Sequence, residues 1–354
     1  MKRYERYLIK ETLIGILLAL LLVVALDALL AFIAELGDVG RGEYGVGAAM
    51  RFIVLTLPHR LLDLLPMAVL LGSLMSLGRL AAGSELIALR SAGVSRASIT
   101  RALLKLGMVL VVIALLIGEY IVPMSEQQAR NGRAVAQSSG ALHKSKHGVW
   151  VRDGRAFVHI RDFYADGKLG KVTRYEFNKQ GQLQSAVSAR SAKYNGEEWY
   201  LFGVERSLVR ESIVVSQSEM AERWSLLLDP ELLSVVATGP RFLSAWDLGK
   251  YILYLRANGL ATQRYELALW NKLISPLSLL VMLFFVVPFV LGPLRDVGAG
   301  KRMVMGLLFG LAFYLLNRTY YQMGQLYNFN PLFSALFPSL LVLAVTMVVL
   351  KRTR

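Results

Sequence analysis

The feature that most constrains this chain is a set of six apolar segments, each about as long as a helix that crosses a lipid bilayer. Such a helix needs about 20 consecutive apolar residues. The chain is 55% hydrophobic, and its mean hydropathy of +0.47 is typical of a membrane protein. We therefore predict six transmembrane helices, at Leu13–Ala34, Phe52–Leu77, Leu106–Met124, Ala268–Gly292, Met303–Tyr321 and Leu332–Leu350.

The positive charges of the short connections predict how these helices are oriented. Residues 1–12, 79–105, 293–302 and 351–354 carry net charges of +2, +4, +2 and +3, whereas residues 35–51 carry −1. Basic loops stay in the cytoplasm. Both termini and the 79–105 loop are therefore expected in the cytoplasm, and the polar stretch 125–267 on the other side of the membrane. These four short cytoplasmic segments carry most of the +15 net charge, and the orientation of the helices explains it. The net charge therefore does not indicate nucleic-acid binding.

Residues 125–267 change from helical periodicity to alternation, which predicts a β-domain. Candidate strands occupy Val172–Phe177, Leu183–Tyr194 and Glu198–Val209, and Asp153-Gly154 is a hairpin signal. A sandwich or jelly roll fits this spacing. It is either a cap with a solid core or a partly open sandwich lined by small residues, which could hold an acyl chain. A helix at about 244–258 leads back to the membrane.

The cytoplasmic stretch between the second and third spans predicts a short amphipathic helix at about 84–92. Ser84 is a candidate N-cap, Glu85 lies in the first turn, Leu86 and Leu89 form an apolar side, and Gly93 ends the helix. Arg90 lies beyond Glu85 by slightly more than a turn. A solvated loop helix and a docking element both fit this pattern.

Charged residues inside the predicted spans are costly and point to function. Arg60 and Asp63 are three residues apart and so share a helix face, which predicts an intramembrane charged pair or a charged cavity wall. Asp27 lies in the first span with no local partner.

The chain offers no reaction chemistry of its own. It has no cysteine, its four histidines form no convincing metal site, and "GAGKR" at 298–302 fails the P-loop pattern because no Ser or Thr follows Lys301. We expect no catalytic residue, no metal and no cofactor bound by this chain.

Five stretches in order resemble the lipopolysaccharide-export ABC permeases, the LptF/LptG family, and the last three look more like its LptG branch. They are "PMAVLLGSLMSLGRLA" (66–81), "SELIALRSAG" (84–93), "GEYIVPMSEQQARNGRA" (118–134), "GVWVRDG" (148–154) and "FVLGPLR" (289–295). The resemblance covers essentially the whole chain and implies an α-helical inner-membrane protein of a Gram-negative bacterium with an inserted periplasmic jelly roll.

The resemblance also implies partners and site residues. It implies a heterodimer with an LptF-type subunit, an LptB-type ATPase dimer that binds ATP and Mg, an LptC-type periplasmic protein, and lipopolysaccharide as substrate. The loop helix would be a coupling helix that contacts the ATPase through Glu85, Leu86, Leu89 and Arg90.

Arg41, Arg130 and Arg133 would contact lipid phosphates by the same resemblance. The family has lysines at the end of the first span, where this chain has Glu35, Gly37 and Asp38. The first and fifth spans would be lateral gates. Gly306 and Gly310 in the fifth form a G-x-x-x-G pair that serves either the gate or packing within the chain.

The predicted organisation is therefore three transmembrane helices in 1–124, a periplasmic β-domain in 125–267 and three transmembrane helices in 268–354. The predicted function is an ATP-driven permease subunit that extracts lipopolysaccharide. A permease for another envelope lipid or lipoprotein and a non-transporting scaffold or receptor are the alternatives.

Overall fold

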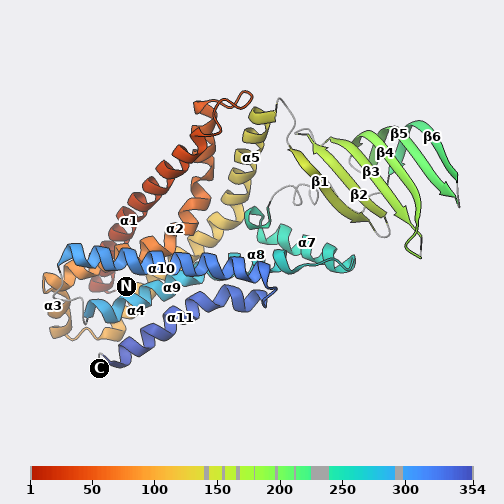
Figure 1. Ribbon diagram of the computed structural model, residues 1–354. Coiled ribbons are helices and arrows are strands. Elements are labelled where there is room, and N and C mark those ends of the chain that lie inside the picture. The colour runs from red at the N-terminus through yellow and green to blue at the C-terminus, as the bar shows by residue number, and fades with distance from the viewer. Residues whose placement is uncertain are drawn as a thin grey trace. The chain divides into compact units, whose positions relative to one another are not determined.

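The computed structural model describes residues 2–138, 143–153, 156–164, 168–178, 180–195, 198–210, 213–224, 239–291 and 298–352 (Figure 1). The chain divides into two compact units. One contains Met1–Ile33, Thr56–Ser125 and Gln263–Arg354, and the other contains Ala34–Leu55 and Glu126–Thr262. The second unit thus combines the inserted polar stretch with the connection between the first two long helices.

Among the described residues, six helical segments are long and apolar enough to cross a membrane, as the sequence predicted. They are α1 (Arg3–Leu36), α2 (Val46–Ala82), α4 (Arg96–Leu116), α8 with α9 (Gln263–Ile274 and Ser278–Leu291), α10 (Ala299–Leu326) and α11 (Pro331–Arg352). The third segment passes through a π-helical turn at Ile117–Ile121 into α5 (Val122–Ser138). Within the second of these units, Ser244 caps α7 (Ala245–Ala257).

The helix α2 is the most buried of the six spans, and glycines let its neighbours approach it closely. A Cβ atom on Gly72 would lie 2.4 Å from the carbonyl oxygen of Gly15, so α1 and α2 meet backbone to backbone. On α10, Gly306 faces Leu71 and Gly310 faces Met67, both on α2. The G-x-x-x-G pair therefore packs within the chain, which is one of its two predicted roles.

The insert forms one antiparallel sheet in which six strands follow each other in chain order. The strands are β1 (His143–Asp153), β2 (Ala156–Phe163), β3 (Leu169–Phe177), β4 (Leu183–Tyr194), β5 (Trp199–Arg210) and β6 (Ile213–Trp224). The predicted β-domain is confirmed. A jelly roll needs a second sheet with crossover connections, and the described strands form only this one.

One face of the sheet carries an apolar cluster that includes Val158, Ile160, Val172, Trp199 and Trp224. On β4, Ser185, Val187 and Ala189 are buried, so small residues contribute to this face, as alternation along Leu183–Tyr194 predicts for one side of the strand. Beyond Ala189 the pattern shifts, since Ala192 is buried and Lys193 is exposed.

Candidate functional site

The loop between α2 and α4 contains the predicted short helix, α3 (Glu85–Ser91). Gly93 ends it in a left-handed conformation with φ of 86°, and the amide of Val94 donates to the carbonyl of Leu89 at 3.0 Å. The predicted Ser84 cap is wrong. Only Gly83 and Ser84 separate α3 from α2, and this tight corner holds Ser84 at φ of 60°, whereas an N-cap residue needs an extended backbone.

The two sides of α3 have different surroundings. Leu86 is 3% exposed and belongs to the core of the helical unit, where Leu89 and Val94 pack against it. Glu85, Ala88, Arg90 and Ser91 are exposed. The family resemblance predicts that Leu86 contacts the ATPase. Leu86 is instead an anchor, because a short helix of seven residues buries its apolar side against the helices that carry it.

Polar contacts tie α3 and its flanks to the first turns of α1. Tyr7 donates its hydroxyl to Glu85 Oε2 at 2.6 Å. Arg79, at the end of α2, pairs with Glu11, and Lys105 Nζ lies 2.9 Å from Glu5 Oε2. The short helix is therefore held at two places, by Leu86 in the core and by Glu85 on α1.

The charged residues within the spans pair differently from the prediction. Arg60 Nη1 lies 2.6 Å from Asp27 Oδ2 on α1, and Asp63 lies 3.5 Å from His59 Nε2. The expected Arg60–Asp63 pair is thus replaced by a link between two helices. The long Arg60 side chain reaches a carboxylate across the α1–α2 contact, which spacing along one helix does not reveal.

Arg133 on α5 is held by two carboxylates from the end of α1. Its Nε lies 2.9 Å from Glu35 Oε1, its Nη2 pairs with Asp38, and Tyr44 donates to Glu35 at 2.8 Å. Arg41 Nη1 also contacts Asp38, at 2.6 Å. Burial raises the pKa of the Tyr44 hydroxyl, and its hydrogen bond to Glu35 adds to the shift. Two of the three predicted headgroup arginines therefore meet at one carboxylate.

Arg130 lies apart from that cluster. It contacts Glu126 at 3.1 Å, one turn earlier on α5, and its guanidinium lies 3.9 Å from the ring centre of Phe242. Its side chain is 43% exposed and that of Arg41 is 70% exposed, against 31% for Arg133. The two accessible arginines of the three are therefore Arg41 and Arg130.

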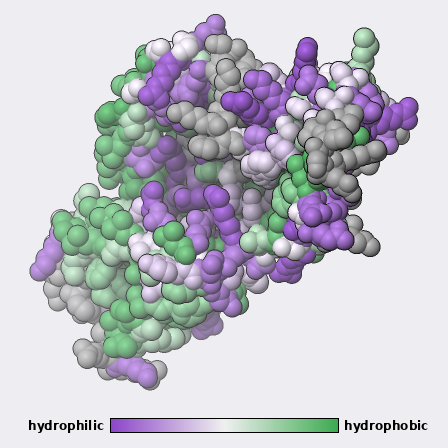
Figure 2. Space-filling model, turned by 45° about the vertical axis from the view of Figure 1, so that its right-hand side comes forward, coloured by the Kyte–Doolittle hydropathy of each residue, from purple (hydrophilic) through white to green (hydrophobic). Residues whose placement is uncertain are grey.

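The helices α1 and α10 leave most of their apolar surface open. Only 17% of the most apolar stretch of each is buried, against 72% for α2. Large exposed side chains on α1 include Leu18, Leu21 and Leu30, and Figure 2 shows hydrophobic residues on the surface of the molecule. These faces suit lipid or another apolar protein surface.

Sequence reasoning missed Tyr7, Glu11 and Tyr44. No local signal marks them, since each partner is distant in the chain or lies across a turn. Among the described residues, no group of three or more metal-binding side chains is present.

Comparison with known proteins agrees with this arrangement along nearly the whole chain. Residues 6–352 match the family described as lipopolysaccharide export system permease LptF/LptG. The chain is 37% identical over 352 residues to the lipopolysaccharide export system permease protein LptG of Haemophilus influenzae, covering 99% of this chain and 98% of that protein. It is 35% identical to LptG of Escherichia coli K12, covering 95% and 94%. The chain belongs to the LptF/LptG family of lipopolysaccharide export system permeases.

Proposed function

We propose that this chain is a multi-pass inner-membrane permease subunit for lipopolysaccharide export, driven by a separate ATPase that contacts α3. Family membership supports the export function, because the relatives named LptG are described as lipopolysaccharide export permeases. The single observation that carries the mechanism is the construction of α3: one side is anchored in the helical core while Glu85, Ala88, Arg90 and Ser91 face outward.

A motor protein needs a rigid element to push on. The short helix is joined directly to α2 and α4, Leu86 fixes it in the core, and Glu85 is bonded to Tyr7. Movement of α3 would therefore reach α1 through Tyr7 and through the Arg79–Glu11 pair. In this mechanism Glu85 and Arg90 contact the ATPase, and Leu86 and Leu89 keep the helix in place.

The proposed partners rest on the resemblance to the LptF/LptG permeases. An LptF-type subunit would cover the open apolar faces of α1 and α10, which act as lateral gates. An LptB-type ATPase dimer would bind ATP and Mg, so this chain needs no nucleotide site, metal or cofactor. The β-domain would lie in the periplasm, with both termini in the cytoplasm, and would pass lipid to an LptC-type protein.

The lipid headgroup would meet Arg41 and Arg130 first, because their side chains are the more exposed ones. Arg133 would bind a phosphate only after leaving Glu35 and Asp38. The substrate's phosphates and these carboxylates therefore compete for the same guanidinium.

The test is purification of the chain with its partner subunits, followed by identification of retained lipid and measurement of its release on addition of ATP. We expect lipopolysaccharide to be retained and then released, and Glu85→Ala to reduce the bound ATPase at least several-fold. Glu43→Ala, which removes an exposed carboxylate in the α1–α2 loop, is the matched control and should leave the complex intact.

Three results would contradict parts of the proposal. Retention of a different lipid or a lipoprotein would assign the chain to another cargo, and a complex without an ATPase would make it a scaffold. Unchanged transport by Glu85→Arg would remove Glu85 from the coupling role.

A further inference from the structure

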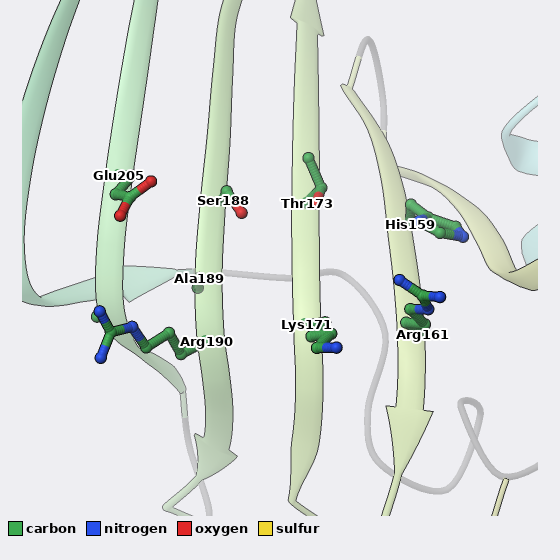
Figure 3. Close-up of a pocket in the computed structure, with 9 residues that line it drawn as sticks. His159, Arg161, Lys171, Thr173, Ser188, Ala189, Arg190 and Glu205 are labelled. Atoms are coloured by element: carbon green, nitrogen blue, oxygen red, sulfur yellow. The ribbon is translucent and has the colours of Figure 1, made fainter. Parts of the chain in front are cut away.

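The polar face of the β-sheet, opposite its apolar cluster, is hollowed by a pocket of about 300 Å³. Its polar lining comes from four neighbouring strands: His159 and Arg161 on β2, Lys171 and Thr173 on β3, Ser188 and Arg190 on β4, and Glu205 on β5. Figure 3 shows these strands side by side, with Arg161 and Lys171 adjacent and Arg190 extending toward the strand of Glu205.

Three positive charges lie in one row of this pocket. The pairs Asp162–Gly170 and Ile160–Val172 place Arg161 beside Lys171, and the pairs Gly170–Ser191 and Val172–Ala189 place Lys171 beside Arg190. Like charges on directly opposed residues destabilise a sheet. Within the described part of the chain, none of the three forms a salt bridge.

The same sheet neutralises its other central arginines. Arg174 contacts Glu176 at 2.8 Å and Glu222 at 3.5 Å, and Arg206 contacts Glu222 at 2.5 Å. These pairs lie on the face of the apolar cluster, because Arg174 is opposite Val158 and Val187 in register. The three cations on the polar face have no such carboxylate partner among the described residues, which leaves a place for a bound anion.

The backbone under the row has a left-handed conformation at two positions. Lys171 has φ of 48°, a left-handed conformation that residues with side chains seldom adopt. Gly203 has φ of 62°, and a Cβ atom there would lie 3.0 Å from Cδ of Arg190. The missing side chain at Gly203 therefore lets Arg190 lie across β5.

An exposed aromatic surface adjoins the pocket. The ring of His159 stacks on Trp150 with centres 4.7 Å apart, and Trp150 stacks on Tyr175 at 5.8 Å. Trp150 is 57% exposed. A broad apolar ring face beside cations and hydroxyls suits a ligand that has a flat apolar side as well as a charge.

We propose that this pocket binds a phosphorylated sugar, with the phosphate on Arg161, Lys171 and Arg190 and the sugar ring against Trp150. Guanidinium groups match phosphate oxygens in paired hydrogen bonds, and Thr173 and Ser188 supply neutral donors. Glu205 accepts a sugar hydroxyl. The sugar phosphate is either part of a glycolipid headgroup or a soluble molecule. This binding site is independent of the contact between α3 and an ATPase.

The soluble arm of the test uses the full chain in detergent, titrated calorimetrically with glucosamine 1-phosphate, inorganic phosphate and glucosamine. We expect glucosamine 1-phosphate to bind most tightly, and the double variant Arg161→Gln/Arg190→Gln to weaken it at least tenfold. Lys193→Gln, which removes an exposed cation from the same strand as Arg190, is the matched control and should change the affinity less than twofold. Trp150→Ala should weaken glucosamine 1-phosphate more than inorganic phosphate.

The lipid arm places a photo-crosslinking amino acid at Ser188 and compares intact with dephosphorylated lipopolysaccharide. Crosslinking that needs the phosphates identifies the headgroup as the source, and binding of the soluble probe alone identifies a free sugar phosphate. The variants remain foldable because removing like charges relieves repulsion, so their thermal midpoints should stay level or rise. No binding in either arm, or an equal loss in Lys193→Gln, would overturn the proposal.

Discussion

The hydroxyl of Tyr7 donates to Oε2 of Glu85 at 2.6 Å, and this bond joins the first turns of α1 to the short helix between α2 and α4. The two residues are 78 positions apart in the chain. The bond links the element proposed to receive the motor's push to a helix proposed to act as a gate.

Tyr7→Phe tests that link because it removes the hydroxyl and keeps the ring. We expect the ATPase to remain bound, since Glu85 is still present, while lipid release per ATP hydrolysed falls several-fold. The loss of one hydrogen bond should cost about 1 kcal/mol of stability. Parallel assays of ATP hydrolysis and lipid release check this, and a proportional fall in both would argue against Tyr7 as a transmitting residue.

The Arg60–Asp27 pair should show strong coupling between α1 and α2. Asp27→Asn leaves a cation without its partner inside a span and should lower the unfolding free energy by about 1–3 kcal/mol. Arg60→Gln alone should cost a similar amount, and the double variant clearly less than the sum. Thermal unfolding in detergent measures all three. Strict additivity would show that the two residues do not interact.

The backbone contact between Gly15 and Gly72 predicts a position-specific cost for a single methyl group. Gly72→Ala places Cβ 2.4 Å from the Gly15 carbonyl and should lower the unfolding midpoint in detergent by several degrees. Gly47→Ala on the same helix is the matched control, because no atom lies within 4 Å of the new Cβ. It should be neutral or stabilising by up to about 1 kcal/mol. Equal effects at both sites would contradict the close helix contact.

Tyr44 predicts a dependence of stability on alkaline pH. Its pKa is raised in the folded protein by burial and by Glu35, whereas an unfolded tyrosine titrates near about 10. The stabilisation of the folded state that results from this raised pKa is complete below the pKa of the unfolded tyrosine. It is lost as the pH rises above that value, because Tyr44 of the unfolded chain then ionises first. The stability difference between the wild type and Tyr44→Phe should therefore shrink from pH 8 to pH 11. A difference that is constant or grows would exclude this assignment.

Hydrophobic patterns along the sequence predicted the architecture well. Apolar runs predicted the six spans because a bilayer requires them, and alternation predicted β4 at Leu183–Tyr194 with its true bounds. Gly93 was identifiable as a helix end because a left-handed residue is needed there. In each case the requirement is local or is imposed by the membrane.

Side-chain partners were not predictable in the same way. Spacing along α2 offers Asp63 as the partner of Arg60, because the two share a helix face. The actual partner is Asp27, which only the packing of α1 on α2 brings near. In the sequence, Glu35 and Asp38 stand where the family has lysines, which suggests only that a basic segment is missing. In the structure, their carboxylates hold the guanidinium of Arg133. The Ser84 backbone depends on how sharply α2 turns into α3, which composition does not specify.

The most direct test of the coupling role uses the fact that the natural chain has no cysteine. Single cysteines are placed at Ala88 and Ser91 on the exposed side of α3, and at Glu43 in the α1–α2 loop as control. In intact cells, α3 cysteines should crosslink to a nucleotide-hydrolysing subunit and resist a membrane-impermeant maleimide, whereas the Glu43 cysteine should react with it. Labelling of α3 from outside, or no capture of an ATPase from either α3 position, would contradict the coupling role.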